Sequence, residues 1–157
     1  SPGLTTVAGG IEYFAADDGL HGRELWRTDG TRGGTRLVKD VLPGQPGSSP
    51  SSLLAYGGAL LFIAQREPYS CALWRSDGTD AGTTRLSPFF GCGFFFGDGA
   101  PTVLPPVVAA GQVYFASSDE LWRSDGTPTG TARVKRIDGA FVRIDGLSAA
   151  GGRLFFY

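Results

Sequence analysis

One phrase is written three times in this chain of 157 residues, and the repetition limits the possible folds more than any other feature. Each copy contains Leu-Trp-Arg followed by Asp-Gly-Thr, and the tryptophans, Trp26, Trp74 and Trp122, recur at intervals of 48 residues. Periods of about 20–50 residues are typical of chains built by copying one supersecondary unit. We therefore expect a series of similar units rather than one irregular core.

The residues after each tryptophan indicate a tight turn. The repeat motif consists of Trp26, Asp29, Gly30, Thr31; Trp74, Asp77, Gly78, Thr79; and Trp122, Asp125, Gly126, Thr127. A Gly-Thr pair follows each turn at a fixed offset, at residues 34–35, 82–83 and 130–131. An aspartate can accept hydrogen bonds from the amides just ahead of it, and glycine adopts positive φ at little cost. We interpret the motif as structural and expect each aspartate to bond within its own turn.

A second shared phrase, a glycine followed by an aromatic run, precedes each tryptophan. It spans residues 10–14, 58–62 and 111–115, and recurs at 152–156 without a tryptophan after it. In the first unit we expect strands at 4–7, 11–15, 25–28 and 35–41, with a hairpin turn at Gly9 and Gly10. Four short strands per unit, with an aromatic and a turn phrase, are typical of propeller blades.

The predicted fold is all-β and β-propeller-like, with antiparallel four-stranded blades of about 48 residues. One repeat domain would span 1–157, with units at approximately 4–52, 53–102 and 103–145 and a partial unit at 146–157. Three blades and a half-blade are too few for the usual ring of four to eight. Both ends also look cut from a longer product. We therefore expect another polypeptide chain, a precursor fragment or a copy of this chain, to complete the ring.

The repeated string resembles the ELWxxDGT tandem repeat, a bacterial family found in secreted or cell-surface proteins, and its turn is similar to the Asp-box turn of sialidases and other propellers. The resemblance covers nearly the whole chain in three copies, although Ala72 replaces the glutamate in the second copy and the third has a shorter loop before its tryptophan. It implies a propeller-like architecture and a secreted or surface location, and it implies no known activity.

Charge and motif content argue against several classes of function. The formal net charge is −1, so no basic footprint for nucleic acid is visible, and no apolar run reaches the ~20 residues of a membrane span. No Ser-His-Asp order, metal-ligand spacing or phosphate loop is present. We therefore expect no enzyme, no catalytic residue, no cofactor and no metal, and we expect the lone His21 to be solvated.

Two functions remain. The preferred one is a non-catalytic structural or interaction module of a secreted or cell-surface repeat protein, because packing residues must be copied into every unit whereas catalytic residues seldom are. The alternative is a carbohydrate-binding, lectin-like propeller, in which the tryptophan, arginine and aspartate side chains line sites between blades. The partner would then be a glycan.

The two cysteines, Cys71 and Cys92, lie in the second unit. An even count in an exported protein favours a disulfide between them. The alternatives are two buried free thiols or a metal-binding pair.

A phenylalanine-rich stretch at residues 87–106 has no counterpart in the other units. Its five rings form a candidate binding patch: Phe89, Phe90, Phe94, Phe95 and Phe96. They would either plug a blade boundary or the end of a central channel, or form an exposed patch for a partner. Asp98 in the same stretch is a single carboxylate and therefore a poor calcium site.

Overall fold

The computed structural model describes residues 5–92, 103–117, 119–137 and 144–157. Every regular element in these segments is a β-strand, so the predicted all-β class is confirmed. The chain forms two compact units, residues 1–88 and 89–157.

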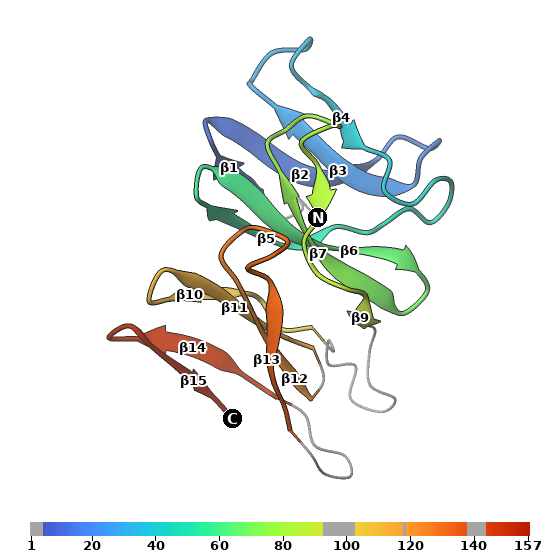
Figure 1. The fold of residues 1–157 in the computed structure, drawn as a ribbon. Coiled ribbons are helices and arrows are strands. Elements are labelled where there is room, and N and C mark those ends of the chain that lie inside the picture. The colour runs from blue at the N-terminus through green and yellow to red at the C-terminus, as the bar shows by residue number, and fades with distance from the viewer. Residues whose placement is uncertain (1–4, 93–102, 118, 138–143) are drawn as a thin grey trace. The chain divides into compact units, whose positions relative to one another are not determined.

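The first sheet of the N-terminal unit contains four antiparallel strands in the order in which they follow one another along the chain (Figure 1). They are β1 (Thr6–Ala8), β2 (Ile11–Asp17), β3 (Arg23–Thr28) and β4 (Arg36–Lys39). Gly9 and Gly10, with φ of 58° and 78°, make the turn between β1 and β2. Only glycine adopts such dihedrals without strain, so the hairpin lies where the sequence predicts it.

The second sheet repeats this order with β5 (Ser51–Tyr56), β6 (Ala59–Glu67), β7 (Ser70–Ser76) and β8 (Thr84–Arg85). Residues 59–64 of β6 are all buried, which explains why this strand is an unbroken apolar run rather than an alternating one. The two sheets share one core: Ala8, Tyr13, Leu25, Val38, Val41, Leu60, Phe62, Ala64, Ala72 and Trp74.

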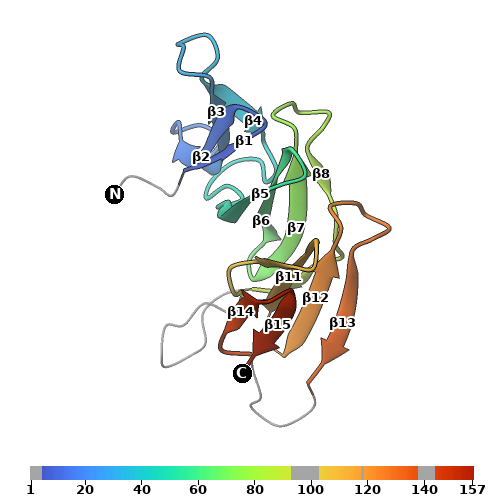
Figure 2. The same cartoon turned by 90° about the vertical axis from the view of Figure 1, so that its left-hand side faces the viewer.

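The C-terminal unit contains the short β9 (Phe90–Gly91), which Figure 1 labels, and a third sheet and a two-stranded hairpin, which Figure 2 shows from the side. The third sheet consists of β10 (Val107–Ala109), β11 (Gln112–Ser117), β12 (Glu120–Ser124) and β13 (Ala132–Arg136), again in chain order. The hairpin consists of β14 (Leu147–Ala150) and β15 (Arg153–Phe156). One apolar cluster joins the third sheet to the hairpin: Ala116, Leu121 and Ile144, with Leu104, Ile137, Leu147 and Leu154 against them.

The three sheets share one strand register. The phenylalanine of the second strand lies opposite the tryptophan of the third strand in each sheet: Phe14 opposite Trp26, Phe62 opposite Trp74, and Phe115 opposite Trp122. The preceding leucines, Leu25, Leu73 and Leu121, are buried. The predicted four-stranded antiparallel units are therefore present, and the sequence period is the period of the sheets.

Candidate functional site

The aspartate of each repeated turn is bonded within its own turn. Asp29 Oδ1 accepts hydrogen bonds from the Thr31 backbone N at 2.9 Å and the Thr31 Oγ1 at 2.7 Å. The same pair of bonds joins Asp77 to Thr79 and Asp125 to Thr127. The bonds from the threonine, first its hydroxyl and then its amide, lower the pKa of all three carboxyls. This is the hydrogen bonding that the turn chemistry predicts.

The residue five positions after each aspartate must be a glycine, because the carboxylate occupies the space that a side chain would need. A Cβ added at Gly34, Gly82 or Gly130 would lie 1.9–2.1 Å from the nearest carboxyl atom of that turn's aspartate. The backbone N of the same glycine donates to the threonine hydroxyl at 2.9–3.0 Å. The carboxylate therefore lies directly against the glycine backbone. Any larger residue at this position would collide with the aspartate, which explains why each copy of the motif has a glycine there.

A pair of hydroxyl groups closes each turn at its base, and sequence reasoning missed one member of it. The residue before the aspartate bonds to the threonine seven positions later: Thr28 to Thr35, Ser76 to Thr83, and Ser124 to Thr131, at 2.7–2.8 Å. The same first hydroxyl accepts the backbone N of the turn glycine at 3.0 Å in all three turns. A Ser or Thr at that offset in every copy was the available signal.

Within the N-terminal unit, the turn of the second sheet packs on the first sheet. Arg27 Nη1 donates to the Gly78 carbonyl oxygen at 3.2 Å, and a Cβ added at Gly78 would lie 2.9 Å from the Tyr13 hydroxyl. Tyr13 is buried, and burial is the main cause that raises its pKa. Lys39 adds an ion pair with Asp80 of the same turn at 3.0 Å. Arg27 thus holds the turn of the second sheet against the first sheet.

Glu24 is a fully buried carboxylate with three hydrogen-bond donors around it. The backbone N of Leu42 donates to Oε1 at 3.0 Å, the backbone N of Ser48 to Oε1 at 2.8 Å, and the Ser48 hydroxyl to Oε2 at 2.5 Å. Glu24 therefore fastens the segment after β4 to the first sheet. The second sheet carries the buried Ala72 at this position. In the third sheet Glu120 has this position and instead accepts hydrogen bonds from the Trp122 indole N–H at 3.3 Å and from Arg133 Nη1 at 2.5 Å.

The tryptophan rings serve packing. Trp74 and Trp122 are buried, and each stacks on the phenylalanine opposite it, with ring centroids 6.4 Å and 6.0 Å apart. The indole N–H groups of Trp26 and Trp74 are buried and have no hydrogen-bond partner among the residues that the structure describes. Their polar atoms are thus turned away from any ligand in solution.

A disulfide joins Cys71, in β7, to Cys92, because both cysteines are disulfide-bonded and the chain has two. The bond agrees with the pairing favoured from the sequence and removes the free-thiol and metal-pair alternatives.

Of the phenylalanine-rich stretch, the structure describes residues 87–92 and 103–106. Phe90 is buried and packs against Phe115 and Trp122 of the third sheet at 5.6 Å and 6.1 Å between ring centroids. Phe89 is 37% exposed. Phe94, Phe95, Phe96 and Asp98 lie outside the described residues. Phe90 therefore has a core role, and the interpretation of the five rings as a plug or as a binding patch stays a prediction.

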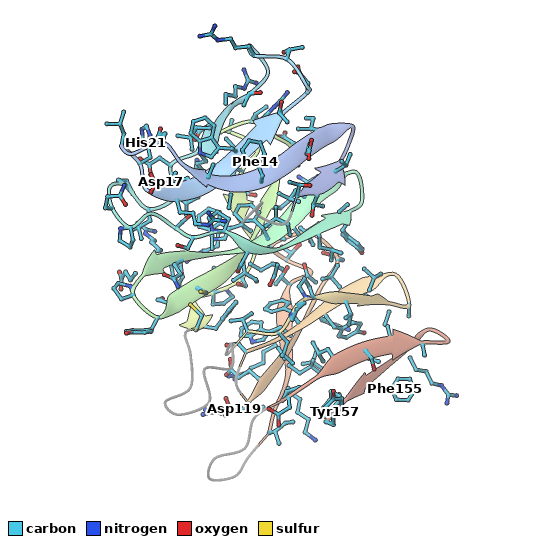
Figure 3. All side chains as sticks on the ribbon, turned by 180° about the vertical axis from the view of Figure 1, so that it is seen from behind. Phe14, Asp17, His21, Asp119, Phe155 and Tyr157 are labelled. Atoms are coloured by element: carbon cyan, nitrogen blue, oxygen red, sulfur yellow. The ribbon has the colours of Figure 1, made fainter. Side chains whose placement is uncertain are left out.

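The loop after β2 holds a local pair of Asp18 and His21; Figure 3 labels His21 of this loop and Asp17 at the end of β2. Asp18 Oδ2 lies 2.7 Å from His21 Nδ1, and Asp18 Oδ1 accepts the backbone N of Leu20 and of His21 at 2.9 Å. The bonds from His21 lower the pKa of Asp18 to about 2, and the bond from Asp18 raises the pKa of His21. Among the described residues, no three His, Cys, Asp or Glu side chains gather as a metal site would require.

The β14–β15 hairpin presents aromatic side chains to solvent. Phe155 is 51% exposed, Phe156 42% and Tyr157 81%, and Figure 3 labels Phe155 and Tyr157 on this hairpin. The backbone N of Asp145 donates to the Tyr157 carbonyl oxygen at 2.7 Å, so the exposed rings stand on an ordered strand. Contiguous exposed apolar residues on ordered structure mark a candidate interaction surface.

No known protein-family model matches the chain, and no curated protein matches it. No helix formed by the described residues is long and apolar enough to cross a membrane.

Proposed function

We propose that this chain is a non-catalytic structural and interaction module of a bacterial secreted or cell-surface repeat protein. Its sheets would be propeller blades, and the chain would assemble with other polypeptide, either the rest of its precursor or a further copy. The resemblance to the ELWxxDGT repeats supports the architecture and the location. The disulfide is a second support for the location, because disulfides persist in oxidising compartments.

The proposal rests mainly on one observation: the polar side chains of the repeat motif make their hydrogen bonds within the chain itself. The carboxylates of Asp29, Asp77 and Asp125 bond to the threonines of their own turns and lie against their own glycines. Arg27 bonds to a backbone carbonyl of the neighbouring sheet. These groups are engaged in holding strands, turns and neighbouring sheets together, as scaffold residues must be in every copy.

The carbohydrate-binding alternative would require the tryptophan rings at the ligand surface. Trp74 and Trp122 are buried, at 9% and 7% exposure, whereas Trp26 is half-buried with its indole N–H covered. The burial of two of the three rings favours the scaffold role.

Two measurements test the proposal. Light scattering of the isolated chain over a wide concentration range should give a mass that rises above 16.5 kDa, because an exposed apolar strand edge associates. A glycan array should give no binding that free sugar competes away. A constant monomer mass together with saturable, sugar-competed binding would contradict the proposal in favour of the alternative.

A further inference from the structure

Strand β15 occupies the place of the second strand in a repeat unit. Each of these strands has a glycine four residues before its phenylalanine, and on this alignment Phe156 corresponds to Phe14, Phe62 and Phe115, each of which lies opposite a tryptophan. Among the described residues, β15 pairs only with β14. One edge of this strand therefore carries backbone groups that, in each four-stranded sheet, bond to the Leu-Trp-Arg strand.

The exposure of Phe156 supports the same comparison. Phe62 and Phe115 are 0% exposed, and each stacks on its tryptophan, whereas Phe156 is 42% exposed. A strand placed beside β15 in the common register would bring a tryptophan to Phe156. We therefore expect the partner of the exposed Phe156 ring to be a tryptophan on the added strand.

A second, independent surface lies on the third sheet. In the first sheet, Tyr13 and Arg27 are covered by the turn of the second sheet, with Tyr13 buried and Arg27 bonded to the Gly78 carbonyl. The corresponding residues of the third sheet are Tyr114, which is half-buried, and Arg123, which is exposed. The β14–β15 hairpin contacts β10 as β5 contacts β1, so the turn that follows a strand paired to β15 would reach Tyr114 and Arg123.

We infer that the free edge of β15, together with Tyr114 and Arg123, is a docking site for a two-stranded segment carrying the phrase Leu-Trp-Arg-(Ser/Thr)-Asp-Gly-Thr. Its first strand adds to β15 with the tryptophan opposite Phe156, a case of β-augmentation. Its Asp-Gly-Thr turn covers Tyr114, and the glycine carbonyl accepts a hydrogen bond from Arg123. The inference rests on the proposed function and specifies its partner and register.

The probe is a labelled synthetic peptide with the sequence of residues 119–137, which contains β12, its turn and β13. Fluorescence anisotropy with the intact chain should show saturable binding. Replacing the peptide's Trp122 by alanine should weaken binding about tenfold or more, because buried aromatic anchors dominate such interfaces. Phe156→Ala and Arg123→Gln in the chain should each weaken it as well. Val7→Thr, which alters an exposed apolar residue of β1, is the matched control and should have no effect.

A fusion protein provides a second experiment, which can detect docking of the segment even if the affinity of the free peptide is low. Residues 119–137 are appended to the chain through a Gly-Ser linker, which raises the effective concentration of the segment to about the millimolar range. The fusion should melt at a higher temperature than the same fusion with the appended tryptophan changed to alanine.

Absence of both peptide binding and fusion stabilisation, or binding that Phe156→Ala leaves unchanged, would overturn the inference. If the chain still associates in light scattering in that case, another surface is used and the proposed function stands. If a second copy occupies the site, the peptide should reverse that association.

Discussion

Replacing Gly82 by alanine would put a methyl group against the carboxylate that defines the second turn. The added Cβ would lie 2.1 Å from both Asp77 oxygens, well inside the 3.0 Å below which a neighbour must shift. Gly82 does not have positive φ, so alanine is compatible with the backbone. The conflict with Asp77 is therefore the expected source of any destabilisation.

The magnitude follows from the bonds that the carboxylate must give up. Moving Asp77 away from the new methyl group breaks its bonds to the Thr79 backbone N, at 2.9 Å, and to the Thr79 Oγ1, at 2.7 Å. A hydrogen bond contributes about 0.5–1.5 kcal/mol net, and an exposed turn lies at the low end of that range. Gly82→Ala should therefore lower the free energy of unfolding by about 1–2 kcal/mol.

A double-mutant cycle separates this cause from others. Denaturant unfolding would be measured for the unmodified chain, Gly82→Ala, Asp77→Ala and the double variant. Without the carboxylate the methyl group has room, so Gly82→Ala should be nearly neutral in the Asp77→Ala background, or slightly stabilising because alanine restricts the unfolded chain.

Gly33→Ala is the matched control. Gly33 has the place in the first turn that Ala81 has in the second, and no atom lies within 4 Å of a Cβ added there. It should leave stability unchanged. An equal loss from Gly82→Ala in both backgrounds, or an equal loss from Gly33→Ala, would refute the reasoning.

Three further predictions concern single features. Glu24→Ala should lower the free energy of unfolding by about 2–4 kcal/mol, because buried donors lose their acceptor, and Glu24→Gln should lose less; a neutral Glu24→Ala would contradict the clamp. An NMR titration of His21, the one histidine, should give a pKa above 6.5 that returns towards 6.5 in Asp18→Asn. Since the folded pKa of His21 is raised and that of Asp18 is lowered to about 2, the stability from this pair is fully present between about pH 4 and pH 6.5. It is lost as pH rises through the folded pKa of His21 or falls through that of Asp18; an unshifted His21 would rule it out. Thiol titration of unfolded, unreduced protein should find no free thiol, and Cys92→Ser should cost about 3 kcal/mol; two titratable thiols would be decisive against the disulfide between Cys71 and Cys92.

The strands and turns could be predicted because their causes are local. The Gly9-Gly10 hairpin and the Asp-Gly-Thr turns depend on dihedrals and on hydrogen bonds between residues two to seven positions apart. The fixed period then indicated that one arrangement is copied, and the three sheets repeat it with the same register.

The contacts that join these pieces could not be predicted, because they depend on residues far apart in the sequence. Glu24 meets the backbone of Ser48, and Arg27 meets Gly78, only after the sheets have formed. The aromatic stretch was likewise ambiguous, since a phenylalanine suits a core or a surface equally. Phe90 lies in a core, whereas Phe89 is partly exposed, and no periodic pattern separated the two.

Amide hydrogen exchange along β15 tests most directly whether this strand is an assembly edge. The chain would be compared at low and high concentration, and with and without the peptide of residues 119–137. The account predicts that amides of residues 153–157 directed away from β14 gain protection as the complex forms, while the amides of β2, which lies between β1 and β3 in the first sheet, stay unchanged. Association without added protection at β15 would contradict it.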